Sequence, residues 1–274
     1  MPSKEQTVSD AVALFGTARY PQGLSAETAW LGIYQVLLWY EEIGAGGISR
    51  LLHIIDADKL RPSASRARRG ITASSKAWQR KAQAVEDYLV ERLGLGKASL
   101  PQYLGRLFQH PDYKELQKQN PLGTAFAGLI KHVLETFGHP GIEYRLEVDA
   151  TTIFPGIPMT GRSTTPSIDI LALKDGLPRA VISSKWGVRH DRINEITNEC
   201  PVYKAAALRM RTVLSFFVVT NEFDPSRLAK ILADPCIDAV VHVHKVGVTD
   251  VCDQNGRLSR LFDLGDLVKL TGLW

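Results

Sequence analysis

Hydrophobic residues recur at helical spacing through the first half of the chain. Within residues 25–43, Ala29, Ile33 and Leu37 share one face, which predicts a helix that Ser25 caps. A second stripe between residues 74 and 93 advances by steps of three and four positions and predicts another long helix. Two further helices are expected, near 49–57 and near 123–137. The first part of the chain is therefore predicted to be helical.

The pattern changes after Gly141, where apolar and polar residues begin to alternate as they do in β-strands. An Asp175-Gly176 pair supplies a turn between two of these segments. Pro201 is expected to break or restart the helix in which it falls. The expected strands are 142–148, 167–173, 179–185, 213–220 and 239–246, and the expected helices are 191–211, 226–232 and 261–270.

This order of elements predicts an α/β fold, with an α/β/α core around a central mixed β-sheet and a helical N-terminal subdomain before it. We expect residues 1–72 to form the helical subdomain and a basic arm, and residues 73–274 to form the second domain. With 274 residues, the chain is long enough to bury a substantial core.

Composition excludes a few classes of protein. Hydrophobic residues make up 45% and charged residues 23%, as in ordinary globular domains. The best apolar run, 30–40, is too short to span a membrane, and the N-terminus lacks a signal-peptide core. Cys200, Cys236 and Cys252 show no metal-ligand spacing, so we expect reduced thiols and a cytoplasmic protein without membrane partners.

The net charge of +4 is mild, but its distribution is uneven. Residues 59–85 contain eight Lys or Arg and no acidic residue. Within them, the stretch that holds Arg66, Arg68 and Arg69 is typical of an exposed arm that lies along DNA phosphates. A solvated linker is the alternative interpretation of the same residues.

Asp169 and Lys185 are the strongest candidates for chemistry. The hairpin that turns at 175–176 brings Asp169 roughly opposite residues 182–185, which places a carboxylate beside an ammonium group. Carboxylates that hold Mg²⁺, with a lysine beside the attacking water, provide what phosphodiester cleavage needs. By itself such a pair is also typical of strand ends with an incidental ion pair.

The residues that flank this pair favour the catalytic interpretation. Ser183-Ser184-Lys185 is followed by Arg189-His190-Asp191-Arg192, which starts four residues after the lysine, and by Glu199, fourteen residues after it. The stretch resembles type II restriction endonucleases of the PD-(D/E)xK superfamily, in the branch that reads CCGG and carries a Ser-x-Lys…Glu variant. One departure is Ile168, which stands where the family usually has proline before the catalytic aspartate.

The resemblance implies a restriction-endonuclease-like core and a role for each matched residue. Asp169 and Glu199 would be carboxylate ligands of the metal, and the carbonyl of Ser184 would add a third ligand. Lys185 would orient or activate the attacking water. Ser183 marks the position at which this branch lacks the usual acidic residue.

Relatives also use a glutamate from an earlier helix. Glu86 is the candidate here, because it borders the apolar side of its helix and follows a basic, serine-rich stretch. A solvated helix carboxylate is the alternative. Glu91 and Glu135 are weaker choices, and Glu195 competes with Glu199 in location but lacks the family's spacing.

Arg189, Asp191 and Arg192 make chemical sense as a base-reading element. Arginine donates two hydrogen bonds to guanine O6 and N7, and aspartate accepts one from cytosine N4 in the major groove. A salt-bridge cluster at a helix start is the alternative. Outside this region, His242 and His244 lack a third ligand, so we expect structural roles for them.

These observations predict a Mg²⁺-dependent type II restriction endonuclease, a hydrolase that cuts both strands of a short palindromic site containing CCGG. By resemblance, the cut leaves 5′ overhangs. A palindromic duplex matches a two-fold symmetric protein, so we expect a homodimer, with a tetramer possible. The alternatives are a nuclease of the same fold, either reading an interrupted CC(N)GG site or acting in repair, and a DNA-binding protein without catalysis.

Overall fold

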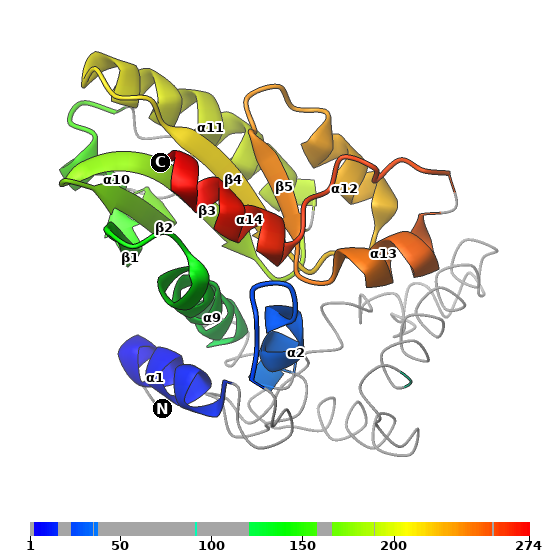
Figure 1. The fold of residues 1–274 in the computed structure, drawn as a ribbon. Helices are drawn as coiled ribbons and strands as arrows, with labels where there is room; N and C mark the ends of the chain where they lie inside the picture. Colours follow the sequence, from blue (N-terminus) through cyan, green and yellow to red (C-terminus); the bar gives the residue numbers. More distant parts are fainter. Residues whose placement is uncertain are drawn as a thin grey trace, which may run out of the picture.

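The computed structural model describes residues 3–15, 23–34, 36–37, 91, 121–157, 166–188, 190–253 and 255–274. Figure 1 labels the helices and strands in this part of the chain. The elements are α1 (Lys4–Leu14), α2 (Ala29–Tyr34), α9 (Pro121–Phe137), β1 (Ile142–Asp149), α10 (Ala150–Ile153), β2 (Ser167–Lys174), β3 (Leu177–Lys185), α11 (His190–Arg209), β4 (Ser215–Thr220), α12 (Pro225–Leu232), β5 (Ala239–His242), α13 (Lys245–Cys252) and α14 (Leu264–Leu270).

The five strands form one mixed sheet in the order β1-β2-β3-β4-β5. β1, β2 and β3 are antiparallel neighbours, whereas β3, β4 and β5 run parallel. Asp175 and Gly176 make the two-residue turn between β2 and β3, and both have positive φ, 53° and 74°. Such a turn follows the right-handed twist of the strands, which explains the choice of Asp-Gly. The predicted mixed sheet is confirmed.

Helices cover both faces of the sheet. Phe216 and Phe217 are neighbours in β4, so their side chains point to opposite faces. Phe216 stacks on Tyr203 of α11, and Phe217 packs against Trp274, which follows α14. Helix α9 lies on the α14 side, where Phe126 meets Trp186 after β3 with ring centroids 5.2 Å apart. The arrangement is therefore a layered α/β/α sandwich (Figure 1).

The described N-terminal helices share the core of the sheet. Ala11 of α1 and Ile33 of α2 are fully buried in the same hydrophobic cluster as strand residues such as Ile170 and Val219. Figure 1 shows α1 and α2 beside α9. The expected boundary near 72 and the predicted helices 49–57 and 74–93 lie outside the described residues, apart from residue 91.

Three sequence predictions are wrong in detail. Pro201 lies inside α11, which continues through it, because the buried face of the helix, including Ile196 and Cys200, offsets the lost backbone hydrogen bond. The strand predicted for 239–246 ends at His242, where the imidazole Nδ1 accepts the His244 N–H at 3.0 Å, and α13 begins at Lys245. Helices α1, α10 and α13 were not predicted at all.

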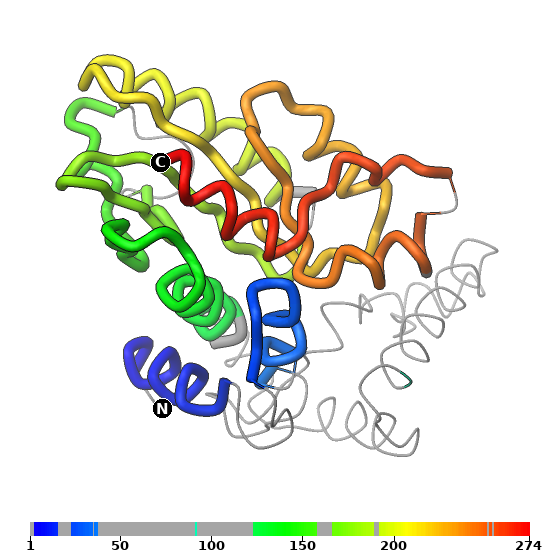
Figure 2. The backbone as a smooth tube through the Cα atoms, in the orientation of Figure 1, coloured from blue at the N-terminus to red at the C-terminus, as the bar shows by residue number. Residues whose placement is uncertain are grey.

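The C-terminal segment closes the α9 face. Asp263 and Asp266 form a reciprocal capping box that starts α14. Past the helix, the Thr271 hydroxyl accepts the His139 N–H at 2.7 Å, and Lys174 at the end of β2 bonds the Trp274 carbonyl. Figure 2 shows the resulting path of the chain end across the sheet. In the part of the chain that the structure describes, no helix has the length and hydropathy of a membrane span.

Candidate active site

The site begins where β2 and β3 stop pairing. The last paired residues at this end of the hairpin are Ile170 and Ile182, and Asp169 and Ser183 come next on the two strands. The Ser184 N–H then donates to Asp169 Oδ2 at 2.8 Å. The Asp169 side chain thus takes the place of a β2 carbonyl as the acceptor of the Ser184 N–H. This hydrogen bond fixes the carboxylate between the two strands.

Lys185 completes the pair. Its ammonium Nζ lies 2.6 Å from Asp169 Oδ2, and the two side chains are 18% and 28% exposed. Pairing of Lys185 with Thr220 of β4 holds the lysine backbone from the other side. The Ser183 hydroxyl lies 3.4 Å from the same carboxylate oxygen, at the outer limit of a hydrogen bond. The structure therefore brings Asp169, Lys185 and the Ser-x-Lys segment together.

Glu199 faces this pair from α11. It is partly buried and makes no hydrogen bond or ion pair with any residue that the structure describes. Burial raises the pKa of Glu199 to about 7, and the negative charges of Glu195 and Asp169 act in the same direction, while Lys185 and Arg192 oppose them. A carboxylate whose pKa is raised and that has no partner among the described residues is a group that can accept a cation.

Tyr203 is a site residue that the sequence analysis missed. Its ring stacks between Phe154 and Phe216, and its hydroxyl is buried without a hydrogen-bond partner among the described residues. Helical side chains lean toward the N-terminus, so Tyr203 leans toward Glu199, one turn earlier. Burial, followed by the charge of Glu199, raises the pKa of the Tyr203 phenol, which keeps it protonated. Its position four residues after Glu199 on the same helix is the sequence feature that could have indicated a place beside the site.

The base-reading element is described only in part. Arg192 lies in the first turn of α11, and its guanidinium forms an ion pair with Glu195. Asp191 belongs to the same turn, but its side chain, like Arg189, lies outside the described residues. The same holds for the basic-arm residues Arg66, Arg68 and Arg69 and for Glu86. Of the weaker glutamate candidates, Glu135 pairs with Lys131 at 2.5 Å.

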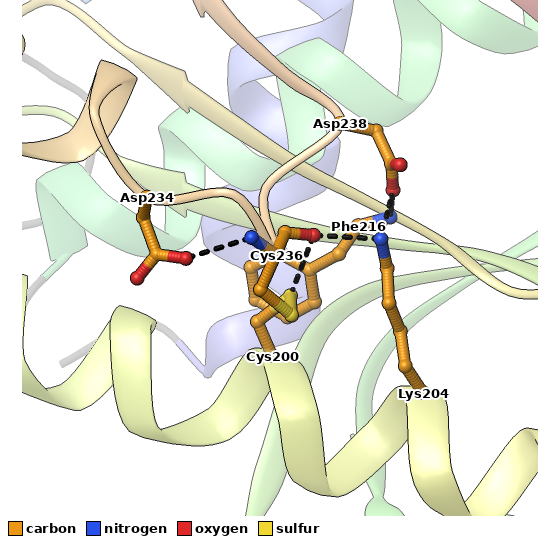
Figure 3. The surroundings of a disulfide bond; sticks show 6 residues. All are labelled: Cys200, Lys204, Phe216, Asp234, Cys236 and Asp238. Carbon is orange, nitrogen blue, oxygen red and sulfur yellow. Dashed lines mark hydrogen bonds and ion pairs between the residues drawn. A yellow bond between two sulfur atoms is a disulfide. The ribbon is translucent and has the colours of Figure 1, made fainter.

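The prediction of three reduced cysteines is wrong. Cys200 and Cys236 form a disulfide that joins α11 to the segment between α12 and β5 (Figure 3). The spacing of 36 residues gave no sign of this pair, since it depends on how α11 packs beside α12. Lys204 adds a second link, with Nζ 2.7 Å from Asp238. Because Cys200 directly follows Glu199, the disulfide fixes the helix segment that carries the candidate ligand.

The donor set suits a hard divalent cation. Asp169 Oδ1 and both oxygens of Glu199 carry no hydrogen bond from a described residue, so they are available as ligands. The Ser184 N–H faces Asp169, and the carbonyl of a strand residue points to the same side as its N–H. Oxygen ligands of this kind fit Mg²⁺. No cluster of three or more His, Cys, Asp or Glu is close enough to hold a metal within the described ranges.

Taken together, the arrangement holds an ammonium group against one carboxylate and leaves oxygen donors unfilled beside it. An ammonium group and a cation held by these oxygens can polarise a phosphate ester and orient a water molecule next to it. Comparison of the sequence with protein-family models and with curated proteins gives no match.

Proposed function

We propose that the protein is a Mg²⁺-dependent type II restriction endonuclease that cuts both strands of a palindromic DNA site containing CCGG. The observation that carries the proposal is the Asp169–Lys185 ion pair at the point where β2 and β3 diverge, with the Ser184 amide on the same carboxylate. The spacing from Lys185 to Arg189, Arg192 and Glu199 supports the choice of the CCGG-reading branch.

Each residue has a part in hydrolysis. Asp169 and Glu199 would hold the cation, with the Ser184 carbonyl as a further ligand. A bound Mg²⁺ supplies charge neutralisation at the scissile phosphate and an activated water. Lys185, fixed 2.6 Å from Asp169, orients the attacking water with its ammonium group. Tyr203 excludes bulk water from the inner side of the site, because its ring fills the space between Phe154 and Phe216.

Recognition would come from the start of α11 and from the basic arm. Arg189 and Arg192 donate to guanine, Asp191 accepts from cytosine, and Arg66, Arg68 and Arg69 contact phosphates. Two copies of the chain related by a two-fold axis match the two half-sites, so the active form is a homodimer or a pair of dimers. By resemblance, the products carry 5′ overhangs. The Arg192–Glu195 pair must open or share its guanidinium when DNA binds.

The test is digestion of plasmid DNA with the purified protein and Mg²⁺, followed by sequencing of the ends. Cuts at CCGG-containing sites that disappear in Lys185→Ala support the proposal. Cuts at CC(N)GG sites favour a nuclease of the same fold with an interrupted target. Specific binding without any cutting favours a DNA-binding protein and contradicts catalysis.

A further inference from the structure

The loop between β3 and α11 links the candidate catalytic lysine to the proposed base-reading element. Its described residues, Trp186, Gly187 and Val188, follow Lys185 directly and precede Arg189. Trp186 is 3% exposed and Val188 is fully buried. The two residues that follow β4 hold both, since the Trp186 carbonyl accepts the Asn221 N–H at 3.0 Å and the Val188 N–H donates to Glu222 Oε2 at 2.9 Å.

Glu222 is a buried carboxylate with a complete set of donors. Its side chain is 2% exposed, and Oε2 accepts from Arg227 Nη1 at 3.1 Å as well as from the Val188 amide. The other oxygen, Oε1, accepts the Asp224 N–H at 2.8 Å. A buried charge is costly unless its hydrogen bonds are all made, and here a cation and two amides make them.

His242 fixes the backbone of Glu222 from the neighbouring strand. The Nδ1 of His242 accepts the His244 N–H at 3.0 Å, so the proton of this neutral ring is on Nε2. Nε2 therefore donates to the Glu222 carbonyl oxygen, 3.0 Å away. Burial lowers the pKa of His242 to about 3, which keeps the ring neutral and this bond in place. Glu222 is thus anchored through its backbone and its carboxylate.

Local structure does not require the bond from Glu222 to Val188. Asp224 already caps α12 by accepting the Ser226 N–H at 2.9 Å, so the helix start has its own acceptor. The Val188 amide lies 34 residues away in sequence, and its bond to Glu222 joins the loop after β3 to the segment after β4. The carboxylate therefore fixes the segment that leads into the first turn of α11.

We propose that Glu222 is a positioning residue for base recognition: through Val188 it holds the loop that leads into α11 and so sets Arg192 in register with the DNA bases. The inference rests on the proposed endonuclease function for its DNA side. It also makes a claim about the free protein, that the Glu222 carboxylate keeps the Val188 amide closed. Lys185 is held separately by Asp169 and by β4, so loss of Glu222 should affect reading more than chemistry.

The first measurement is amide hydrogen exchange of the free protein in Glu222→Gln and Glu222→Ala. Glutamine keeps the size of the side chain but places an NH₂ group against hydrogen-bond donors. Alanine removes the acceptor of the Val188 amide altogether. We expect the Val188 amide to exchange about 10- to 100-fold faster, the effect of losing one hydrogen bond to a charged acceptor, while amides of β3 stay protected. If the exchange rate of the Val188 amide is unchanged in Glu222→Gln, and in Glu222→Ala provided that this variant folds, the proposal is overturned.

Asp238→Asn is the matched control. Like Glu222, Asp238 accepts a backbone amide and pairs with a cation: it accepts the Phe216 N–H of β4 at 2.6 Å and pairs with Lys204, near the opposite end of the strand. We expect Asp238→Asn to leave both Val188 exchange and DNA discrimination unchanged. The same loss of discrimination in Asp238→Asn as in Glu222→Gln would reduce Glu222 to a general stabilising role and overturn the proposal.

The second measurement is cleavage kinetics of duplexes that contain CCGG or a singly substituted site. For Glu222→Gln we expect KM for the CCGG duplex to rise about tenfold or more and discrimination to shrink, with kcat changed by less than about threefold. A fall in kcat at constant KM would place Glu222 in the chemistry and overturn the proposal. If the wild type neither binds nor cuts DNA, the endonuclease function and the reading role fail, and Val188 exchange alone decides whether Glu222 holds the loop.

Discussion

Replacing Glu199 by glutamine should stabilise the metal-free protein while it removes activity. The carboxylate is partly buried and unpaired among the described residues, and its pKa is raised from 4.5 to about 7. Folding therefore favours the protonated form. Below pH 4.5 the folded and unfolded states are both protonated and the group costs nothing. Stability is lost as the pH rises from 4.5 through 7, and the full cost is present above pH 7.

The size of the effect follows from the shift. A change from 4.5 to about 7 corresponds, at about 1.4 kcal/mol per unit, to about 3 kcal/mol in the free energy of unfolding. Glutamine keeps the shape without the charge. Glu199→Gln should therefore be more stable than the wild type by about 3 kcal/mol near pH 8 and by less than about 1 kcal/mol near pH 5.

Urea unfolding at the two pH values, with a chelator present, measures this difference. Glu195→Gln is the control on the same helix, because Glu195 is paired with Arg192 and partly exposed; we expect a loss of no more than about 1 kcal/mol. In a parallel titration, Mg²⁺ should raise the unfolding midpoint of the wild type but not of Glu199→Gln. A Glu199→Gln variant that is less stable than the wild type near pH 8, or equally shifted at both pH values, would refute the reasoning.

Three further predictions concern single residues. Arg192→Ala should lose cutting at CCGG sites, because each bidentate contact to guanine contributes about 1–3 kcal/mol of discrimination; normal cutting in a plasmid digest contradicts the reading role. Cys236→Ser should lower the free energy of unfolding by about 2–4 kcal/mol, and a dithiol reductant should lower the thermal midpoint of the wild type but not of the variant. Tyr203→Phe should raise the free energy of unfolding by about 1 kcal/mol in urea, because it removes a buried hydroxyl that no described residue satisfies; a loss of similar size contradicts this.

Local sequence signals predicted much of the sheet. The strands around Asp175-Gly176 follow from short apolar runs on both sides of a dipeptide that takes positive φ at both positions. The hairpin alone does not set Asp169 beside Ser183 and Lys185, because an irregularity between Ala172 and Leu173 shifts the pairing with β3 by one residue. The fourteen-residue spacing between Lys185 and Glu199 gained its meaning from the family resemblance. A role for this glutamate in catalysis stays a prediction.

Tertiary contacts explain what the sequence did not reveal. The rule that proline ends a helix did not hold at Pro201, because the burial of α11 against the sheet stabilises the helix on both sides of it. The alternation around His242 continued past the real strand end, where an imidazole bonds the backbone. The Cys200–Cys236 disulfide and the Val188–Glu222 hydrogen bond join residues 36 and 34 positions apart, so no local pattern contains them.

Cleavage of one defined duplex tests the central claim most directly. The substrate is a short duplex with a single CCGG site, incubated with excess protein, with Mg²⁺ or with a chelator, and compared with a duplex that carries GGCC instead. We expect both strands of the CCGG duplex to be cut only with Mg²⁺, and Lys185→Ala to bind it but to cut about 100- to 1,000-fold more slowly or not at all. Equal cutting by Lys185→Ala, or binding of the CCGG duplex without cutting by the wild type, would contradict an active site built on Asp169 and Lys185.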